Sequence, residues 1–278
     1  MKFENEVAVV TGAGGTLCSV IAVEMARLGA KVVLIGRTKE KLEKTAKKNG
    51  EIGGTYRICP CDGTDEKAMQ EVADTIEKEW GPCRFLINGA GGNNQLAMTT
   101  GIELTDETLA EGHEGRNFFD LDMDIFDSVL RINTTGTVIA CRVFGKQMAK
   151  VKQGGILNFA SMNTYCPLTR VPAYAMSKAA IANFTQWLAS YFAPMGIRVN
   201  AVAPGFFVNE RSINYLGSVE TGLTARGQSV INHTPMGRFG EAIDLWGCVK
   251  WLLNDDEAAF VSGITVPVDG AFLTRSGV

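Results

Sequence analysis

Residues 7–18 read VAVVTGAGGTLC, a short apolar run followed by a glycine-bearing turn and the beginning of a helical pattern. Four consecutive apolar residues at 7–10 are typical of a strand covered on both faces. The glycines let the backbone turn tightly and approach a ligand closely. A strand, a glycine turn and a helix in this order bring backbone N–H groups and a helix N-terminus against a pyrophosphate. The stretch therefore predicts the first unit of a dinucleotide-binding sheet.

The same alternation of strand and helix continues along the chain. Strands are expected at residues 7–10, 32–35, 55–58, 85–87, 156–159, 198–202 and 264–268, and several of these runs are continuously apolar. Helical patterns occupy residues 17–28, 39–48, 65–80, 124–150, 172–192 and 241–253. We predict one α/β domain over residues 1–278, a Rossmann-like doubly wound sheet of seven parallel strands flanked by helices on both faces.

Charge and composition narrow the class of protein. The 278 residues carry a formal net charge of −3 without a basic block, so nucleic acid is not an expected partner. No apolar run approaches membrane-spanning length, and the acidic start MKFENE does not resemble a signal peptide. Seven cysteines, an odd number, indicate thiols in a reducing compartment, and we expect a cytoplasmic protein. The two histidines, His113 and His233, lie near no metal or hydrolase motif, so no metal is expected.

Two segments are longer than the usual loops of a compact domain. Residues 91–121 follow the fourth predicted strand, and residues 204–237 follow the sixth. Open α/β sheets bind ligands at the carboxyl ends of their strands, so both segments are candidate substrate loops. Surface decoration and a subunit contact are the alternatives.

The residues after the second strand bear on the choice of cofactor. An acidic residue usually holds the ribose hydroxyls of NAD at this position, but the sequence has Arg37 and Thr38. Arg37 is suited to pair with the 2′-phosphate of NADP, and Thr38 to donate a hydrogen bond to it. We therefore favour NADP(H) slightly over NAD(H). The alternative is that Arg37 is a solvated partner of acidic neighbours.

Residues 161–178, SMNTYCPLTRVPAYAMSK, contain three polar side chains that one reacting centre can use. If a helix begins after Pro172, Tyr174 and Lys178 are one turn apart on the same face. An ammonium beside a phenol favours the phenolate, although lowering a tyrosine pKa from ~10 to ~7 requires about 4 kcal/mol. Ser161 is the third polar group. The alternative is a simple surface pair on a helix.

Taken together, these motifs resemble the short-chain dehydrogenase/reductase family over nearly the whole chain. Its glycine turn is at Gly12, its Asn-Asn-Ala-Gly motif is similar to residues 88–91, and its Pro-Gly motif is at residues 204–205. The family's catalytic positions correspond to Asn133, Ser161, Tyr174 and Lys178. The resemblance implies that the cofactor is bound by Gly12, Gly14, Gly15, Thr16, Leu17, Arg37, Thr38, Asp62, Gly63, Asn88, Gly89, Ala90, Tyr174, Lys178, Pro204, Gly205 and Phe207.

The chain departs from the family pattern at a few positions. Thr16 and Cys18 stand where glycines are usual, and Gly89 replaces the second asparagine of its motif. Asn209 stands where a cofactor-contacting threonine is common. Because both glycine replacements are small, we expect cofactor binding to persist with altered local packing.

The resemblance also implies a mechanism. Hydride moves between the nicotinamide and a carbonyl or carbinol carbon, and Tyr174 exchanges the proton with the oxygen. Ser161 hydrogen-bonds the same oxygen. Lys178 lowers the tyrosine pKa and binds the nicotinamide ribose, while Asn133 holds a water that links Lys178 to solvent.

The expected substrate is a small, polar molecule. Amides and hydroxyls around the catalytic stretch suit a polyol, and an arginine suits a carboxylate, so we favour a sugar acid. Arg170 is the first candidate for the carboxylate, followed by Arg211 and then Arg116; a surface or loop-bracing role is the alternative for each. The candidate substrate residues are Asn93, Asn94, Ser161, Asn163, Arg170, Tyr174 and Arg211.

At finer grain the segments GAGGTLC, GAGGNN, FFDLD, PLTRVPAY, FTQWLA and APGFF resemble the D-mannonate oxidoreductase (D-fructuronate reductase) branch of the family. The alternatives are a gluconate-type or polyol dehydrogenase, a 3-oxoacyl carrier-protein reductase, and a catalytically idle dinucleotide-binding regulator. Family members are usually homo-oligomers, most often tetramers. The apolar stripe of Ile181, Phe184, Leu188 and Tyr191 fits a subunit interface or a subunit core.

Overall fold

The fold is a doubly wound parallel sheet, as the sequence predicted. The computed structural model describes residues 3–208, 213–218 and 222–275, and in these residues one sheet has seven strands in the order β3-β2-β1-β4-β5-β6-β9. Every neighbouring pair is parallel. The strands are β1 (Val7–Thr11), β2 (Lys31–Gly36), β3 (Tyr56–Pro60), β4 (Cys83–Asn88), β5 (Gly154–Phe159), β6 (Ile197–Pro204) and β9 (Thr265–Val268).

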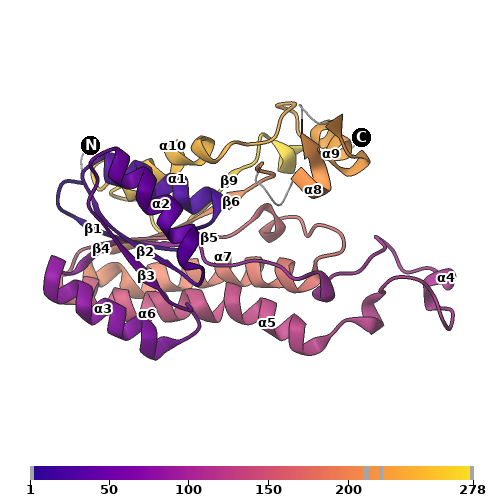
Figure 1. The fold of residues 1–278 in the computed structure, drawn as a ribbon, viewed down its shortest axis with the longest axis horizontal. Coiled ribbons are helices and arrows are strands. Elements are labelled where there is room, and N and C mark those ends of the chain that lie inside the picture. Colours follow the sequence, from indigo (N-terminus) through magenta and orange to yellow (C-terminus); the bar gives the residue numbers. More distant parts are fainter. Residues whose placement is uncertain (1–2, 209–212, 219–221, 276–278) are drawn as a thin grey trace.

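Helices cover both faces of this sheet (Figure 1). One face carries α1 (Thr16–Arg27), α2 (Lys39–Glu51) and α10 (Trp246–Leu253), and the other carries α3 (Glu66–Trp80), α6 (Thr135–Val151) and α7 (Pro172–Phe192). Successive side chains of a strand point to opposite faces. In β1, Ala8 and Val10 therefore enter the first core, whereas Val7 and Val9 enter the second. This explains why the run at 7–10 is continuously apolar.

The chain leaves β1 toward β2 and β3 and then crosses back to β4. The two directions diverge between the carboxyl ends of β1 and β4, which is where open α/β sheets form a ligand crevice. The glycine turn after β1 and the residues after β4 meet at this point. The strand order therefore places the expected ligand crevice at the glycine turn after β1 and at the residues after β4, which the sequence motifs also indicated.

The prediction of one helix over residues 124–150 was wrong. Two helices occupy this region, α5 (Met123–Asn133) and α6, and they are separated at Thr134 with φ −102° and ψ −66°. The Asn133 amide donates to Val129 O at 2.8 Å and to Gly92 O at 2.7 Å. A side chain that bonds the main chain in this way competes with regular helix geometry. The pattern at 241–253 is likewise a short 3₁₀ turn (Ala242–Leu245) followed by α10.

The two long segments lie at the carboxyl end of the sheet. Residues 91–121 form an arm that extends away from the body, with 3₁₀ turns at Gln95–Ala97 and Phe118–Asp120 and α4 (Asp106–Leu109) at its end (Figure 1). The described part of 204–237 contains α8 (Ile213–Leu216), α9 (Ala225–His233) and a two-stranded pair, β7 (Gly217–Ser218) with β8 (Gly222–Leu223). None of the described helices is long and apolar enough to cross a membrane.

The apolar stripe on α7 belongs mainly to the core. Ile181 and Leu188 are buried, and Phe184 packs against one of the two cores. Tyr191 differs, because it is 66% exposed and stacks on Trp187 with 5.1 Å between the ring centroids. The core alternative therefore holds for the first three residues of the stripe.

Candidate active site

The four predicted catalytic residues come from three elements that meet beyond the carboxyl end of β5. Ser161 begins a 3₁₀ turn directly after this strand, Tyr174 and Lys178 lie in the first two turns of α7, and Asn133 ends α5. Tyr174 and Ser161 are hydrogen-bonded through their side chains. The Lys178 Nζ lies 5.5 Å from the centroid of the Tyr174 ring. The structure therefore brings the predicted groups together.

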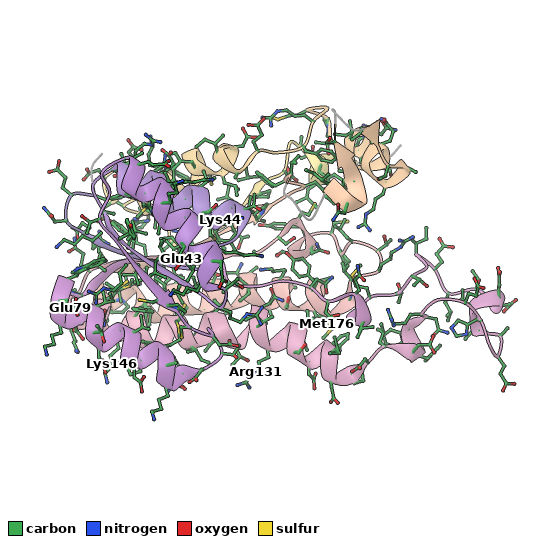
Figure 2. All side chains as sticks on the ribbon, in the orientation of Figure 1. Glu43, Lys44, Glu79, Arg131, Lys146 and Met176 are labelled. Atoms are coloured by element: carbon green, nitrogen blue, oxygen red, sulfur yellow. The ribbon has the colours of Figure 1, made fainter. Side chains whose placement is uncertain are left out.

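Tyr174 and Lys178 are not a surface pair. Lys178 is only 6% exposed, and its ammonium donates to Phe159 O at 2.7 Å. Met176, which Figure 2 labels, lies midway between them in sequence and is 56% exposed. Residues two apart on a helix point in different directions, so Met176 lies on another side of α7. Pro172 at the first position of α7 fixes where the helix begins and hence which residues face inward. The helix-surface alternative for this pair is excluded.

Burial controls the electrostatics of the pair. Desolvation raises the pKa of Tyr174 above its ordinary value, and the hydrogen bond with Ser161 only partly opposes this. Desolvation also lowers the pKa of Lys178 to about 8. The expected lowering of the tyrosine pKa by Lys178 therefore does not outweigh burial in the protein alone. A cationic nicotinamide ring beside the phenol would add the stabilisation of the phenolate that the side chains lack.

Asn133 fastens the loop after β4 to the end of α5, beside the other predicted catalytic residues. Its Oδ1 accepts from Gly92 N at 3.1 Å, and its Nδ2 donates to Gly92 O. A Cβ on Gly91 would overlap the Asn133 Oδ1 and would lie 3.7 Å from Lys178 Nζ. Glycine at position 91 therefore permits this close approach. The water-holding role of Asn133 stays a prediction.

The residues around the β1 turn fit a dinucleotide. Gly12 has φ +67°, and a Cβ there would lie 2.7 Å from Gly89 O, so only glycine is accommodated. Thr11 Oγ1 accepts from Ala90 N at 3.1 Å and ties the ends of β1 and β4 together. Helix α1 begins after Gly15 without a side-chain cap, which leaves its first N–H groups suited to a phosphate. Thr16 and Leu17 are the first residues of this helix.

The residues predicted to bind the adenosine half of the dinucleotide also lie together. Arg37 follows β2, and Thr38 begins α2 without a side-chain cap. Asp62 Oδ1 accepts from Thr64 N and Thr64 Oγ1, each at 2.9 Å. The Thr64 N–H bond is the main cause of a lowered Asp62 pKa, and the charge of Arg37 contributes. Arg37 is thus close enough to Asp62 to act on it electrostatically.

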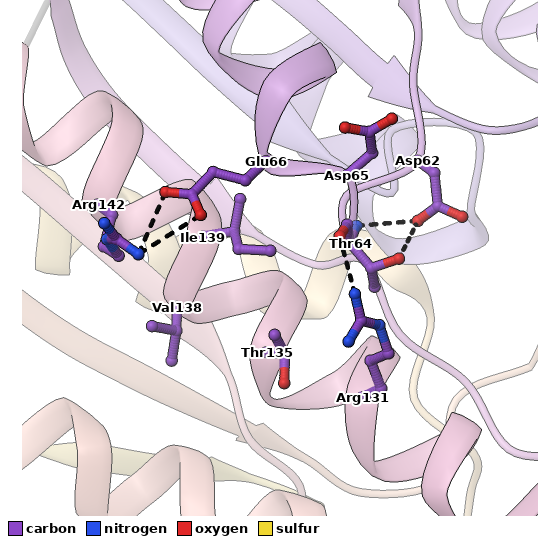
Figure 3. Close-up of a pocket in the computed structure, with 9 residues that line it drawn as sticks. All are labelled: Asp62, Thr64, Asp65, Glu66, Arg131, Thr135, Val138, Ile139 and Arg142. Atoms are coloured by element: carbon purple, nitrogen blue, oxygen red, sulfur yellow. Dashed lines mark hydrogen bonds and ion pairs between the residues drawn. The ribbon is translucent and has the colours of Figure 1, made fainter. Parts of the chain in front are cut away.

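Asp62 is one of the residues that line a groove of about 740 Å³. Figure 3 labels these residues. The walls of the groove come from the loop before α3, the beginning of α3, and α5 and α6, and the predicted catalytic residues Ser161, Tyr174 and Lys178 do not line it. Arg142 and Glu66 form an ion pair across its wall. The groove is therefore separate from the predicted catalytic residues, and it includes one predicted cofactor residue, Asp62.

Several predicted cofactor residues have structural partners. Asn88 donates to Asn158 Oδ1 at 2.9 Å, which joins β4 to β5. Gly205 lies so close to Asp269 that a Cβ would be 2.7 Å from its Cα. Phe207 is buried and packs on Gly240. Gly63 has open space where a Cβ would point.

The candidate substrate residues divide into two groups. Asn163 is buried, donates to Ser161 Oγ at 3.2 Å and accepts from Leu168 N at 2.9 Å through its Oδ1, so it lies against a predicted catalytic side chain. Asn93 and Asn94 use their side-chain oxygens to accept N–H bonds within their own loop. Arg116 donates to the main-chain oxygens of residues 95 and 98, so its guanidinium braces the arm. Arg211 and Asn209 lie outside the described residues.

Arg170 remains available for a ligand. It precedes Tyr174 by four residues and has a left-handed φ of +73°. Its main-chain oxygen accepts from Thr99 N at 3.1 Å, but in the described part of the chain its guanidinium has neither a hydrogen bond nor an ion pair. Arg226 of α9 lies close to it: partial burial lowers the pKa of Arg226, and the charge of Arg170 lowers it further. The sequence carried no sign of Arg226, because only the folding of 204–237 brings it here.

A Ser, Tyr and Lys constellation on a doubly wound sheet, with a glycine cradle at its switch point, defines a nicotinamide-dependent oxidoreductase. The chain belongs to the short-chain dehydrogenase family, whose model, described as short chain dehydrogenase, matches residues 6–214. Homologues in this family are dehydrogenases that act on CH–OH groups.

Comparison with individual proteins agrees with this family. The chain is 43% identical over 274 residues to the uncharacterized oxidoreductase UxuB of Bacillus subtilis, covering 99% of this chain and 97% of the relative. It is 28% identical to D-threitol dehydrogenase of Mycolicibacterium smegmatis, covering 99% and 95%. A crystal structure from Haemophilus influenza, described as a candidate D-mannonate oxidoreductase with bound NAD, matches with a TM-score of 0.94, 40% identity and coverage of 100% and 98%.

Proposed function

We propose that the protein is an NAD(P)-dependent oxidoreductase of keto and hydroxy sugar acids, with D-fructuronate and D-mannonate as its substrate pair. The observation that carries this proposal is the Arg170 guanidinium, which lacks a partner among the described residues and lies four residues before Tyr174. Arginine binds a carboxylate through two parallel hydrogen bonds. The similarity to the candidate D-mannonate oxidoreductase supports the same substrate class.

The site residues give this reaction a simple division of roles. The dinucleotide supplies or accepts the hydride. Tyr174 gives a proton to the substrate oxygen during reduction and takes it back during oxidation. Ser161, already hydrogen-bonded to Tyr174, binds the same oxygen and fixes the reactive carbon. Lys178 places a buried positive charge beside the phenol and stabilises its deprotonated form.

A substrate panel tests the proposal. Purified protein is assayed with D-fructuronate, other keto-sugar acids, neutral ketoses and acetoacetyl thioesters, each with NADH and with NADPH. We expect kcat/KM to be highest for a keto-sugar acid. Reduction of acetoacetyl thioesters but not of keto-sugar acids would identify a 3-oxoacyl reductase instead. Preference for neutral polyols would favour the activity named for the D-threitol relative, and turnover of no carbonyl would favour a binding protein.

Arg170→Ala is expected to raise KM for a keto-sugar acid by about 10- to 100-fold, because one charge-assisted pair contributes ~1.5–3 kcal/mol. KM for the corresponding neutral ketose should change less than about threefold. Arg27→Ala is the matched control, since Arg27 is an exposed arginine on α1 paired with Glu24. Equal effects of Arg170→Ala on the acidic and neutral substrates would remove Arg170 from carboxylate binding.

For the cofactor we propose a modest preference for NADP(H). Arg37 and the missing acidic residue after β2 support NADP(H), whereas the bound NAD of the Haemophilus structure supports NAD(H). Arg37→Ala should raise KM for NADPH by about tenfold and leave KM for NADH nearly unchanged, because only NADPH carries the 2′-phosphate. Parallel increases in both KM values would mean that Arg37 serves Asp62 and the local fold rather than the phosphate.

Cytoplasmic localisation and a homotetramer are part of the same proposal. The family is commonly tetrameric. Sedimentation equilibrium of the purified protein measures the oligomeric state, and a monomer across the working concentration range would contradict the tetramer.

A further inference from the structure

Cys18 and Gly89, two residues that differ from the family sequence pattern, lie next to each other in the structure. Cys18, in the first turn of α1, is only 4% exposed, and Gly89 directly follows β4. A Cβ on Gly89 would overlap the Cys18 Sγ, whereas its distance to the Cys18 Cβ would be an ordinary 3.5 Å. The sulfur atom therefore occupies most of the space into which a side chain at position 89 would extend, and the main-chain oxygen of Thr11, 3.2 Å from such a Cβ, is the second close neighbour.

Gly89 lies where three parts of the cofactor site converge. Its carbonyl would be 2.7 Å from a Cβ on Gly12, so the β1 turn packs directly on it. The next residue, Ala90, donates its N–H to Thr11 Oγ1. Gly91 then contacts Asn133 and lies near Lys178. A displacement at position 89 is therefore transmitted to the glycine turn on one side and to the catalytic residues on the other.

The chemistry of Cys18 suits a spacer rather than a reactive group. Burial raises the pKa of its thiol to about 12, and the charge of Lys178 only partly opposes this. The thiol is therefore protonated and neutral near pH 7 and cannot act as an anionic partner of Lys178. The property of Cys18 that can affect the cofactor site is therefore the volume of its side chain, which lies between α1 and the loop after β4.

We infer that Cys18 is a positioning residue for the cofactor site, and that Cys18 and Gly89 are a reciprocal pair in which the thiol takes the place of a side chain at position 89. The thiol sets the separation between α1 and the loop of residues 89–92. This loop carries the Asn133 contact and closes over the β1 turn. The inference goes beyond the proposed function, because it does not depend on which carbonyl compound is the substrate.

A double-mutant cycle of Cys18→Ala, Gly89→Ala and both together tests the pair. The measured quantities are the Kd for NADH and for NADPH, from quenching of tryptophan fluorescence, and the Tm. We expect Gly89→Ala to raise Kd about tenfold through the clash and Cys18→Ala to raise it about threefold through the lost spacer. The double variant should return to within about threefold of the parent, because the two alanine Cβ atoms are 3.5 Å apart and only the 3.2 Å contact with Thr11 O remains tight.

Two control variants separate positioning from simple loss of stability. Cys83→Ala removes a fully buried thiol at the other end of β4, so it should lower the Tm without changing Kd. Gly247→Ala adds a Cβ where no atom lies within 4 Å, so Kd should not change, and the Tm should stay the same or rise slightly because alanine favours a helix more than glycine does. A double variant whose Kd increase equals the product of the single increases would overturn the inference. If Gly89→Ala does not fold, a folded double variant supports the pair and an unfolded one refutes it.

Discussion

Tyr174→Phe is expected to lower kcat by about 10²–10⁴-fold while Kd for the cofactor stays within about twofold of the parent. Phenylalanine keeps the ring that lies 5.5 Å from Lys178 Nζ and removes only the hydroxyl that bonds Ser161. The loss therefore reports proton transfer rather than packing. It should be equally large for reduction and oxidation, because one hydroxyl serves both directions.

Steady-state assays in both directions, with cofactor affinity from fluorescence titration, measure this result. Tyr191→Phe is the control, since Tyr191 is a 66% exposed tyrosine of the same helix. Its kcat should be unchanged. Appreciable turnover by the Tyr174→Phe variant would show that another group supplies the proton, and the role assigned to Tyr174 would be wrong.

The sheet was predictable because parallel strands buried on both faces leave a local signature. All seven strands lie where strands were predicted, and several of these runs are continuously apolar. In β1 the cause is that its four apolar side chains are shared between two cores. The break between α5 and α6 had no local signature. It accompanies hydrogen bonds between Asn133 and Gly92, which are 41 residues apart in sequence. The helical periodicity of apolar residues does not reveal contacts between residues so far apart in sequence.

The sequence predicted which side chains lie together at the candidate site, but not their pKa values. Spacing placed Tyr174 and Lys178 on one face of a helix, and the structure confirms that placement. Their pKa values depend on burial, which raises one and lowers the other, and burial follows from the packing of the whole domain. The sequence ranked Arg170 ahead of Arg116 as a carboxylate ligand but left a loop-bracing role open for both. The structure assigns that bracing role to Arg116, whereas the Arg170 guanidinium is unpaired in the described residues.

Lys178→Met is expected to change activity and stability in opposite directions. The substitution removes the charge beside Tyr174, so kcat should fall by at least about 10²-fold. It also removes a buried ammonium whose pKa is lowered from 10.5 to about 8 by desolvation, a cost on the order of 3 kcal/mol to the folded state. Methionine loses the bond to Phe159 O but fills a similar volume. We expect the Tm near pH 7 to rise by about 5 °C.

The stability gain should depend on pH in a definite direction. Between about pH 8 and pH 10.5 the unfolded parent keeps the Lys178 proton that the folded parent has released, so the stability of the parent rises with pH in this window. The advantage of the methionine variant is therefore complete below about pH 8 and shrinks as the pH approaches 10.5. Thermal unfolding of both proteins at about pH 7 and about pH 9.5 measures the difference.

Lys146→Met is the control for the loss of a positive charge, because Lys146 lies exposed on α6 (Figure 2). Its Tm difference from the parent should be small and nearly independent of pH. A lower Tm for Lys178→Met near pH 7 would show that the bond to Phe159 O outweighs the desolvation of the ammonium. A higher Tm for Lys178→Met would mean that the buried charge of Lys178 destabilises the folded protein. The protein would then tolerate this cost because proton transfer by Tyr174 requires the charge at that position.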